Sequence, residues 1–328
     1  MPKIFVMTKK ILGIGNALVD ALNKLKNDDL LEELGLPKGS MQLVDAETSA
    51  AIQEKTKDLD KEMASGGSAA NTIHGLANLG ADTAFVGTVG DDEIGKFFSN
   101  DLKKSGIKPL LNVSKTASGL ANAMITPDGE RTFGTFLGAA VELSAEDITP
   151  ETFAGYDLLH VEGYLVQNHH LLEAILKTAK NAGLEVSLDL ASYNVVEDNL
   201  PFLKKMVEEY VDIVFANEEE AKAFTGKEPR AALDELAEVT KIAVVKVGSK
   251  GSVIKSGDVI TMVGVNKTEV ADTTGAGDLY AAGFLYGYIN GFTMKKAGEL
   301  GALLASKVIA DYGAKIKPED WEEIKKTL

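Results

Sequence analysis

The sequence predicts an α/β protein: a three-layer α/β/α domain with a mostly parallel central sheet and a small accessory β lid. From about residue 157 onward, short runs of β-branched and apolar residues alternate with longer segments of helical periodicity, which is typical of a parallel sheet. The same alternation starts near residue 11, and two stretches interrupt it, 21–44 and 119–137. We therefore expect one domain over residues 1–328, with these two stretches inserted as the lid.

The elements of the main domain follow from their hydrophobic periodicity. Segment 170–182 carries apolar residues three and four positions apart, which favours a helix that buries one face on the sheet, and helices are also expected over 69–79 and 279–289. Stretch 119–137 alternates around Pro127-Asp128-Gly129, which predicts a hairpin. The expected strands are short apolar runs: 11–14, 83–86, 158–161, 186–190, 213–215 and 242–247.

The composition restricts the possible classes of function. Of the 328 residues 45% are hydrophobic and 25% charged, and the formal net charge is −15. This acidic average field repels nucleic acids and anionic membrane surfaces, so neither is an expected partner, whereas a small anion can bind in a local positive pocket. The absence of cysteine excludes disulfides, thiolate metal sites and a cysteine nucleophile.

The N-terminus and the hydropathy pattern bear on location. The first apolar run is too short for a signal peptide, and the chain has no apolar run of about eighteen residues that would span a bilayer. We therefore expect a cytoplasmic protein. Either Met1 or Met7 can serve as the natural start.

The strongest candidate for a functional motif is the run 275–278, Gly-Ala-Gly-Asp, which precedes the helix expected over 279–289. The glycines let backbone N–H groups approach a ligand, and the helix N-terminus adds partial positive charge, so the run predicts an anion site. From its position alone, Asp278 is either a cap that compensates the helix dipole or a functional carboxylate. Asp272 and the two threonines that follow it favour the functional interpretation.

Residues 272–278 together resemble the C-terminal signature of the ribokinase-like (PfkB) carbohydrate and nucleoside kinases. The resemblance covers about residues 10–315 and implies a ribokinase-like fold with a lid, and in-line transfer of the γ-phosphoryl group of ATP to a primary hydroxyl. It makes the backbone amides of Gly275, Ala276 and Gly277 the anion hole and Asp278 the catalytic base. Such a base contributes roughly 10²- to 10⁴-fold in rate.

A glycine-rich segment, 66–72, resembles the family's N-terminal signature. Taken alone, it is also compatible with a loop that Ser68 caps before a helix. The resemblance implies that Gly67, Ser68 and Asn71 contact the hydroxyls of the substrate.

The first strand leads into a second segment of interest, 13–20. It contains two glycines of a dinucleotide fingerprint, but Leu18 stands where a third glycine or an alanine is required. The segment instead resembles the first strand of the kinase family, which implies that Asn16 and Asp20 hold substrate hydroxyls. The alternative for Asp20 is an ordinary aspartate between a strand and a turn.

A candidate metal site lies in the acidic run 217–220, which begins with Asn217 and ends with Glu220. A solvated acidic helix cap is the simpler interpretation. The spacing also resembles the family's Asn-x-x-Glu motif, which implies that Asn217 and Glu220 organise Mg²⁺, mostly through waters. A potassium-type site near Asp272, Thr274 and the loop 310–314 is a further possibility, because carbonyls in such turns can coordinate the ion.

Candidate ATP contacts lie in segment 246–251, where a strand passes into a tight turn. A hairpin turn is an equally good account of this segment. The resemblance implies that Lys246, Gly248 and Gly251 lie along the nucleotide, together with Thr274. It also aligns Arg131, at the exit of the predicted hairpin turn, with a lid arginine that reaches the phosphates.

The preferred acceptor is adenosine, which would give AMP. This preference rests on four segments that look more like those of adenosine kinases than of sugar kinases: 41–47, which includes Gln42 as a substrate contact, 67–71, 163–165 and 189–192. A purine needs flat apolar contacts, and the candidates for them are Leu43, Met124, Phe133, Phe136 and Tyr164. Against adenosine, Ala17 stands where many adenosine kinases carry proline.

The alternatives within the family are a sugar kinase of the ribokinase or fructokinase type and an inosine or guanosine kinase. A different class of function is a non-catalytic nucleotide-binding protein, but the intact Asp278 beside the glycines argues against it. The oligomeric state is open between a monomer and a homodimer formed through the lid.

Overall fold

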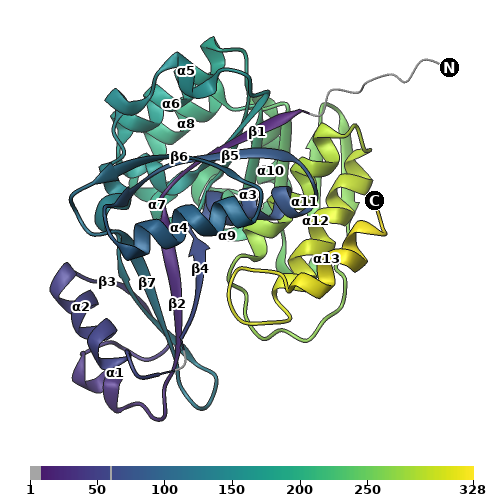
Figure 1. The fold of residues 1–328 in the computed structure, drawn as a ribbon. Coiled ribbons are helices and arrows are strands. Elements are labelled where there is room, and N and C mark those ends of the chain that lie inside the picture. The colour runs from purple at the N-terminus through teal and green to yellow at the C-terminus, as the bar shows by residue number, and fades with distance from the viewer. Residues whose placement is uncertain (1–8, 60) are drawn as a thin grey trace.

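The computed structural model describes residues 9–59 and 61–328. The question whether Met1 or Met7 is the natural start falls outside this range. Within it, the chain forms two β-sheets of unequal size, and helices cover both faces of the larger one (Figure 1).

The larger sheet has nine strands, and it confirms the predicted mostly parallel α/β architecture. In spatial order the strands are β14, β13, β12, β11, β10, β9, β1, β5 and β6, parallel from β12 to β6 and antiparallel over β13 and β14. The central strands are buried on both faces and therefore read as continuous apolar runs. Their bounds are β1 (Lys10–Ile14), β5 (Asp82–Gly90), β6 (Lys108–Ser114), β9 (Leu158–Glu162), β10 (Glu185–Asp189), β11 (Ile213–Asn217), β12 (Ile242–Lys246), β13 (Ser252–Ser256) and β14 (Val259–Val263).

Two apolar clusters, one on each face of this sheet, form the main core. Successive strand residues alternate between them, so Leu158 packs in the first cluster and Leu159 in the second. The first cluster holds α3 (Ser68–Asn78), α4 (Glu93–Lys104), α11 (Ala276–Ile289), α12 (Met294–Val308) and α13 (Pro318–Lys325). The second holds α5 (Pro150–Phe153), α6 (His169–Asn181), α7 (Tyr193–Asp198), α8 (Leu200–Tyr210), α9 (Glu218–Thr225) and α10 (Pro229–Val239).

The smaller sheet forms the lid, and the predicted hairpin belongs to it. Its strands are ordered β3 (Met41–Leu43), β8 (Arg131–Phe136), β7 (Gly119–Ile125), β2 (Leu18–Lys24) and β4 (Lys61–Gly66), and β7 pairs antiparallel with β8. A small cluster around Ile52 and Met124 packs α1 (Asp29–Glu33) and α2 (Ala46–Lys55) onto it.

The lid sheet is larger than the two stretches expected from sequence. It begins at Leu18 rather than at residue 21, and it includes β4, which lies well past residue 44. The sequence of β4, Lys-Glu-Met-Ala-Ser-Gly, has no β-branched residue and weak strand propensity. Its conformation is set by antiparallel pairing with β2, a tertiary contact that local patterns do not report.

The two sheets meet at the carboxyl end of β1. Residues 15–17 connect β1 directly to β2, so the lid sheet extends below the main sheet (Figure 1). The carboxyl ends of β1, β9, β10, β11 and β12 open at the same edge, the usual place for ligand sites in such sheets.

Candidate active site

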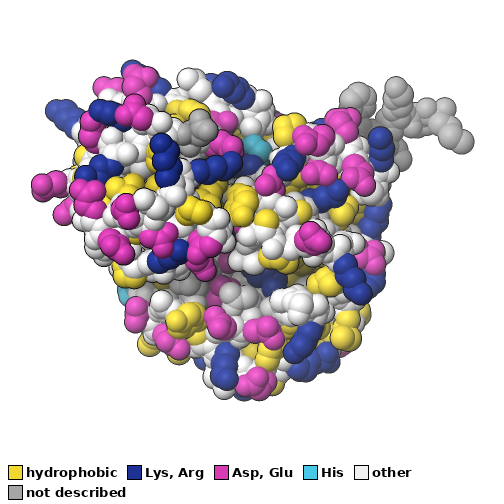
Figure 2. Space-filling view, turned by 90° about the horizontal axis from the view of Figure 1, so that it is seen from below, with side chains coloured by type: hydrophobic (Ala, Val, Ile, Leu, Met, Phe, Trp, Pro, Cys, Tyr) yellow, Lys and Arg dark blue, Asp and Glu magenta, His cyan; other side chains and the backbone are white. Residues whose placement is uncertain are grey.

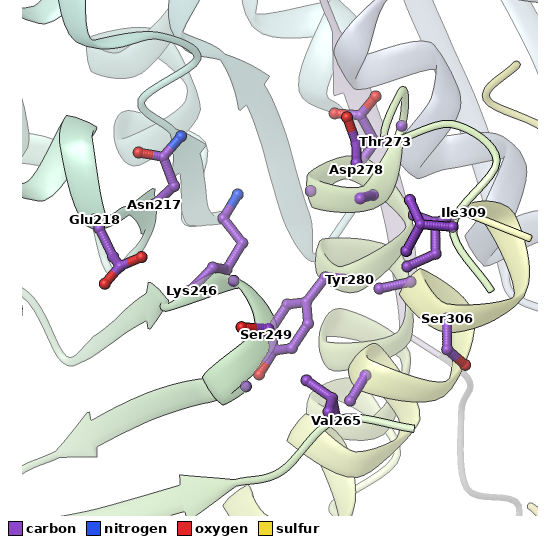
Figure 3. A pocket seen from close by; sticks show the side chains of 18 of the residues that line it. Asn217, Glu218, Lys246, Ser249, Val265, Thr273, Asp278, Tyr280, Ser306 and Ile309 are labelled. Carbon is purple, nitrogen blue, oxygen red and sulfur yellow. The ribbon is translucent and has the colours of Figure 1, made fainter. Parts of the chain in front are cut away.

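A cavity of about 1070 Å³ lies at this edge, between β10–β12 and the N-terminus of α11. On the face seen from the lid side, acidic and basic side chains are interspersed and apolar ones gather near the middle (Figure 2). In the close view, Asn217, Glu218 and Lys246 stand on one side of the cavity, and Asp278 and Ile309 on the other (Figure 3). The predicted residues that line it are Ser68, Asn217, Glu220, Lys246, Gly248, Gly251, Gly275, Ala276, Gly277 and Asp278.

The Gly-Ala-Gly run forms the turn that starts α11. Gly275 caps the helix with φ +75, a left-handed conformation that favours glycine. Ala276 donates its N–H to the carbonyl of Thr273 at 3.2 Å. Residues 275–277 line the cavity, so the positive end of the α11 helix dipole is directed toward it.

Asp278 lies in the first turn of α11, held by two side chains of α3. Its Oδ1 accepts from Ser68 Oγ at 2.7 Å, and its Oδ2 accepts from Asn71 Nδ2 at 3.0 Å. Burial raises the pKa of Asp278, although the hydrogen bonds from Asn71 and Ser68 oppose this effect. The structure thus brings the two sequence motifs together around one carboxylate.

Asp20 lies in β2, against the glycine turn that leads into α3. A Cβ at Gly66 would lie 2.5 Å from the carboxyl of Asp20, and one at Gly67 would lie 2.2 Å from the carbonyl oxygen of Asn16. Gly67 also has φ +94. Glycine at these two positions therefore lets the lid strand approach the start of α3. Burial raises the pKa of Asp20 to about 6, and the charge of Lys315 opposes the rise.

Asn16 contacts a residue that the sequence analysis missed. The backbone N and Nδ2 of Asn16 donate to Glu162 Oε1 at 2.9 and 2.5 Å, and Ala69 N donates to Glu162 Oε2 at 3.1 Å. Glu162 is only 1% exposed, and burial raises its pKa to about 7. The one available signal was a carboxylate that ends the apolar strand β9 directly before Gly163.

Lys246 lies beside the turn formed by residues 275–277. Its Nζ donates to Asp189 Oδ2 at 2.9 Å, and a Cβ at Gly277 would lie 2.9 Å from this Nζ. Burial lowers the pKa of Lys246, but the carboxylates of Asp189 and Glu220 outweigh it and the net pKa is raised. Lys246 therefore stays positively charged at neutral pH.

The opposite wall of the cavity was not predicted. The loop 265–270, one face of α12 with Ala302 and Ala305, and Ile309 directly after this helix supply mostly small or apolar contacts. The sequence of 265–270 is that of an ordinary exposed loop, and the sequence of α12 is that of an ordinary amphipathic helix. Neither marks a binding site, and only the fold brings the two segments to the cavity. Gly248 (φ +53) and Gly251 (φ +95) form the turn that closes this end.

Asn217 and Glu220 form a reciprocal cap at the start of α9. Asn217 donates from N and Nδ2 to the two carboxylate oxygens of Glu220 at 2.7 and 2.6 Å, and Glu220 N donates to Asn217 Oδ1 at 2.8 Å. The structural cap expected as the simpler interpretation is therefore present, and both residues also line the cavity. Burial and the charge of Asp189 raise the pKa of Glu220 to about 7, although Lys246 opposes them.

Arg131 joins the lid to the loop before the 275–277 turn. Its guanidinium makes two contacts with Asp272 and one with Thr274 Oγ1 at 3.2 Å. Asp272 also accepts from Thr274 N and Gly313 N, each at 2.7 Å. The Asp272 carboxylate that was expected near a potassium-type site is thus already bonded to a cation and two amides.

Several of the predicted acceptor contacts lie on the lid, away from this cavity. Gln42 lies on the exposed lid strand β3, opposite Gly134, and does not line the cavity. Among the expected purine contacts, Met124 is buried in the core of the lid and Leu43 is 62% exposed. Tyr164 does line the cavity. An edge strand with exposed side chains and a buried lid strand cannot be told apart by composition alone.

Comparison with known proteins identifies the class. Residues 40–321 match the pfkB family carbohydrate kinase, and the chain belongs to this family and is a phosphotransferase. In the part of the chain that the structure describes, no helix is long and apolar enough to cross a membrane.

The relatives include kinases of nucleosides and of sugars. The adenosine kinase of Sinorhizobium meliloti is 34% identical, with a TM-score of 0.85 over 98% of this chain and 100% of that chain. A probable sugar kinase from Rhizobium etli shares the same identity and TM-score and covers 98% of each chain. The adenosine kinase of Schizophyllum commune is 27% identical over 94% of this chain and 97% of its own length.

Proposed function

We propose that the protein transfers the γ-phosphoryl group of ATP to the primary hydroxyl of a nucleoside, and that the nucleoside is adenosine, which gives AMP. The observation that carries this proposal is the convergence of Ser68, Asn71 and the anion-binding turn on the carboxylate of Asp278. Phosphoryl transfer depends mainly on position and charge stabilisation, and this arrangement supplies both beside a base.

Asp278 is the proposed base. It takes the proton of the acceptor hydroxyl as that oxygen attacks the γ-phosphorus, and ADP leaves on the opposite side. Its raised pKa brings its basicity closer to neutral pH, where a general base works best. Ser68 and Asn71 fix the direction of the carboxylate, so the base is already positioned before substrate arrives.

The phosphates are proposed to lie at the N-terminus of α11. The amides of the 275–277 turn and the ammonium of Lys246 point to the same end of the cavity, and together they stabilise negative charge that develops in transfer. Gly248, Gly251 and the wall from α12 fit the rest of the nucleotide. Arg131 would give up its contacts with Asp272 and, together with Thr274, contact the phosphates of the bound nucleotide instead.

The acceptor is proposed to lie between the lid and α3. Asp20 is well placed to accept hydrogen bonds from a vicinal diol, next to the backbone of Gly67 and the start of α3. Asn16 is held in this region by its hydrogen bonds to Glu162, and its amide oxygen would accept a hydrogen bond from an acceptor hydroxyl.

The residues at the start of α9 fit a divalent cation, which we propose is Mg²⁺. Each carboxylate oxygen of Glu220 accepts one hydrogen bond from Asn217 and keeps lone pairs for a water. The described residues contain no cluster of three or more His, Cys, Asp or Glu side chains that could hold a metal ion. A cation that keeps its waters and binds phosphate needs no such cluster. Bound there, Mg²⁺ would neutralise phosphate charge.

The second candidate is a sugar kinase. It is favoured by the probable sugar kinase from Rhizobium etli, which is as similar to this chain as the adenosine kinase is. Adenosine is preferred because two relatives that match over nearly their full lengths are named adenosine kinases, whereas the Rhizobium etli protein is named only a probable sugar kinase.

The test combines an acceptor screen with a variant of the base. Purified protein with ATP and Mg²⁺ is assayed for ADP release on adenosine, inosine, ribose and fructose, and kcat/KM is expected to be highest for adenosine. Asp278→Asn is expected to lower turnover by at least about 100-fold with ATP binding retained, because the base is lost and the fold is not. Asp258→Asn, on the exposed turn between β13 and β14, is the matched control.

Two results would overturn the proposal. A higher kcat/KM on a free sugar would replace adenosine with the second candidate. Wild-type turnover in Asp278→Asn would remove Asp278 as the base.

A further inference from the structure

Lys315 lies in the loop between α12 and α13, and its side chain reaches the proposed active site at Asn71 of α3. Its Nζ donates to Asn71 Oδ1 at 3.2 Å, and Asn71 Nδ2 donates in turn to Asp278 Oδ2 at 3.0 Å. Among the described residues, no carboxylate forms an ion pair with this ammonium, although Asp20, Asp101 and Asp278 all lie near enough to act on its charge. Neither the motifs nor the proposed function assigns it a role.

The loop holds Lys315 in a fixed place. Gly313 N donates to Asp272 Oδ2 at 2.7 Å, which ties the loop to the ion pair with Arg131. A Cβ on Gly275 would lie 2.7 Å from the Cβ of Ala314, so the residue before Lys315 packs directly on the anion-binding turn. Lys315 is therefore built into the site rather than placed on a free surface.

The contact with Asn71 determines which way the amide points. A lysine ammonium has three donors and no acceptor, so its partner on Asn71 must be the oxygen. The nitrogen of the amide then faces Asp278, where a carboxylate accepts it. Reversal of the amide would bring two donors together at Lys315 and two acceptors at Asp278.

Lys315 also supplies a positive charge that acts on Asp20 in the proposed acceptor site. Asp20 and Asp278 are both buried carboxylates, and each disfavours the ionisation of the other. The Lys315 ammonium opposes the rise in the pKa of Asp20, so its loss removes that compensation, whereas Lys246 still acts on Asp278.

We propose that Lys315 is a positioning residue for phosphoryl transfer: through its contact with Asn71 Oδ1 it holds the Asn71 amide nitrogen toward Asp278. The inference rests on the roles proposed above for Asp278 and Asp20.

The proposal leads to a defined pH dependence. Burial lowers the pKa of Lys315 to about 8, although Asp20, Asp101 and Asp278 oppose the fall. The pKa of Asp20 is raised to about 6. Burial lowers the pKa of His74, the remaining titratable group that faces Lys315, well below its ordinary value, so His74 stays neutral in this range. We expect kcat/KM to fall below about pH 6 and above about pH 8.

The first experiment compares Lys315→Met with Lys315→Arg and with Lys317→Met over this pH range. Lys317 is exposed and pairs with Asp311, so it is a matched control from the same segment. We expect Lys315→Met to lower kcat/KM at least 10-fold, to lose the alkaline limb near pH 8 and to shift the acid limb upward, because Asp20 loses its cation. Lys315→Arg should keep the acid limb in place. A wild-type pH profile in Lys315→Met would overturn the proposal.

The second experiment does not depend on turnover. Wild-type protein with lysines carrying ¹³C at Cε is titrated by NMR, and the Lys315 resonance is assigned as the one missing from Lys315→Arg. We expect the Lys315 amine to titrate near pH 8 in wild type, and we expect Asp20→Asn to lower its pKa, because a counter-charge is removed. An unchanged lysine in Asp20→Asn would contradict the coupling, even if no acceptor is ever turned over.

Discussion

At the scale of single residues, the buried carboxylate of Glu162 connects two parts of the candidate site. Its two oxygens accept from Asn16 and Ala69, so one side chain joins the β1–β2 connection to the first turn of α3. Removal from water raises its pKa from the ordinary value of 4.5 to about 7. The hydrogen bonds compensate only part of that cost.

This raised pKa makes stability depend on pH in a definite direction. Between about pH 4.5 and pH 7 the folded protein binds more protons at Glu162 than the unfolded chain, so this group's contribution is lost as the pH rises. The loss is roughly 3 kcal/mol at most. We expect Glu162→Gln to abolish this dependence, so that the difference in free energy of unfolding between wild type and variant changes across the range.

The measurement is urea unfolding of wild type and Glu162→Gln at several pH values between about pH 5 and pH 8. Glu146→Gln, at an exposed position, serves as the control. A difference between wild type and Glu162→Gln that stays constant with pH would show that Glu162 keeps an ordinary pKa.

The sequence could identify the residues that carry local motifs but not those that arrive through the fold. The runs 66–72 and 272–278 were recognisable, and the structure joins them through the contacts of Ser68 and Asn71 with Asp278. Glu162 and Lys315 lie 146 and 244 positions from their partners Asn16 and Asn71, and no local pattern marks them. Gln42 followed from resemblance alone, and its strand lies at the lid's exposed edge.

At the scale of elements, α11 carries the proposed catalytic turn and lies between two neighbouring helices. The helix is apolar around most of its circumference because α3 packs on one side and α12 on the other. The close approach depends on glycines: a Cβ at Gly283 would lie 2.7 Å from backbone atoms of Leu300 and Gly301, and one at Gly75 would lie 2.6 Å from Ala282.

We expect Gly283→Ala to destabilise the protein by about 1–3 kcal/mol, because the added methyl meets backbone that cannot move without separating α11 from α12. Thermal or urea unfolding measures the effect. Gly264→Ala is the control, since nothing lies within 4 Å of a Cβ at that position. Equal stability in the two variants would show that the helices are less closely packed than described.

Elements with strong periodicity were predictable, whereas those made by pairing were not. The apolar runs of β9 and β11 and the amphipathic pattern of α6 gave their types and approximate bounds. Strand β4 carries no such pattern and depends on β2 for its backbone partners. The mostly parallel sheet and its helices were therefore foreseen more fully than the lid.

At the scale of the whole molecule, the ion pair between Arg131 and Asp272 connects the lid to the main domain. Arg131 belongs to β8, and the side chain of Asp272 is fully buried in the loop before α11. Loss of one partner leaves the other buried and unpaired, which is more costly than loss of both.

We expect Arg131→Met to lower the free energy of unfolding by roughly 3 kcal/mol, and Arg131→Met/Asp272→Asn to recover part of it. A double-mutant cycle by urea unfolding measures the coupling between the two positions. Strictly additive effects would mean that the two side chains do not interact in solution.

The three-residue connection 15–17 gives the lid the geometry of a lever. The strand β2 extends from it for seven residues, about 23 Å, so a rotation of about 10° at this fulcrum carries the far end through about 4 Å. Asp20 lies near the fulcrum and moves roughly half as far. One strand would thus carry its far end about twice as far as the proposed binding group Asp20, and Glu162 holds the connection 15–17 in place through Asn16.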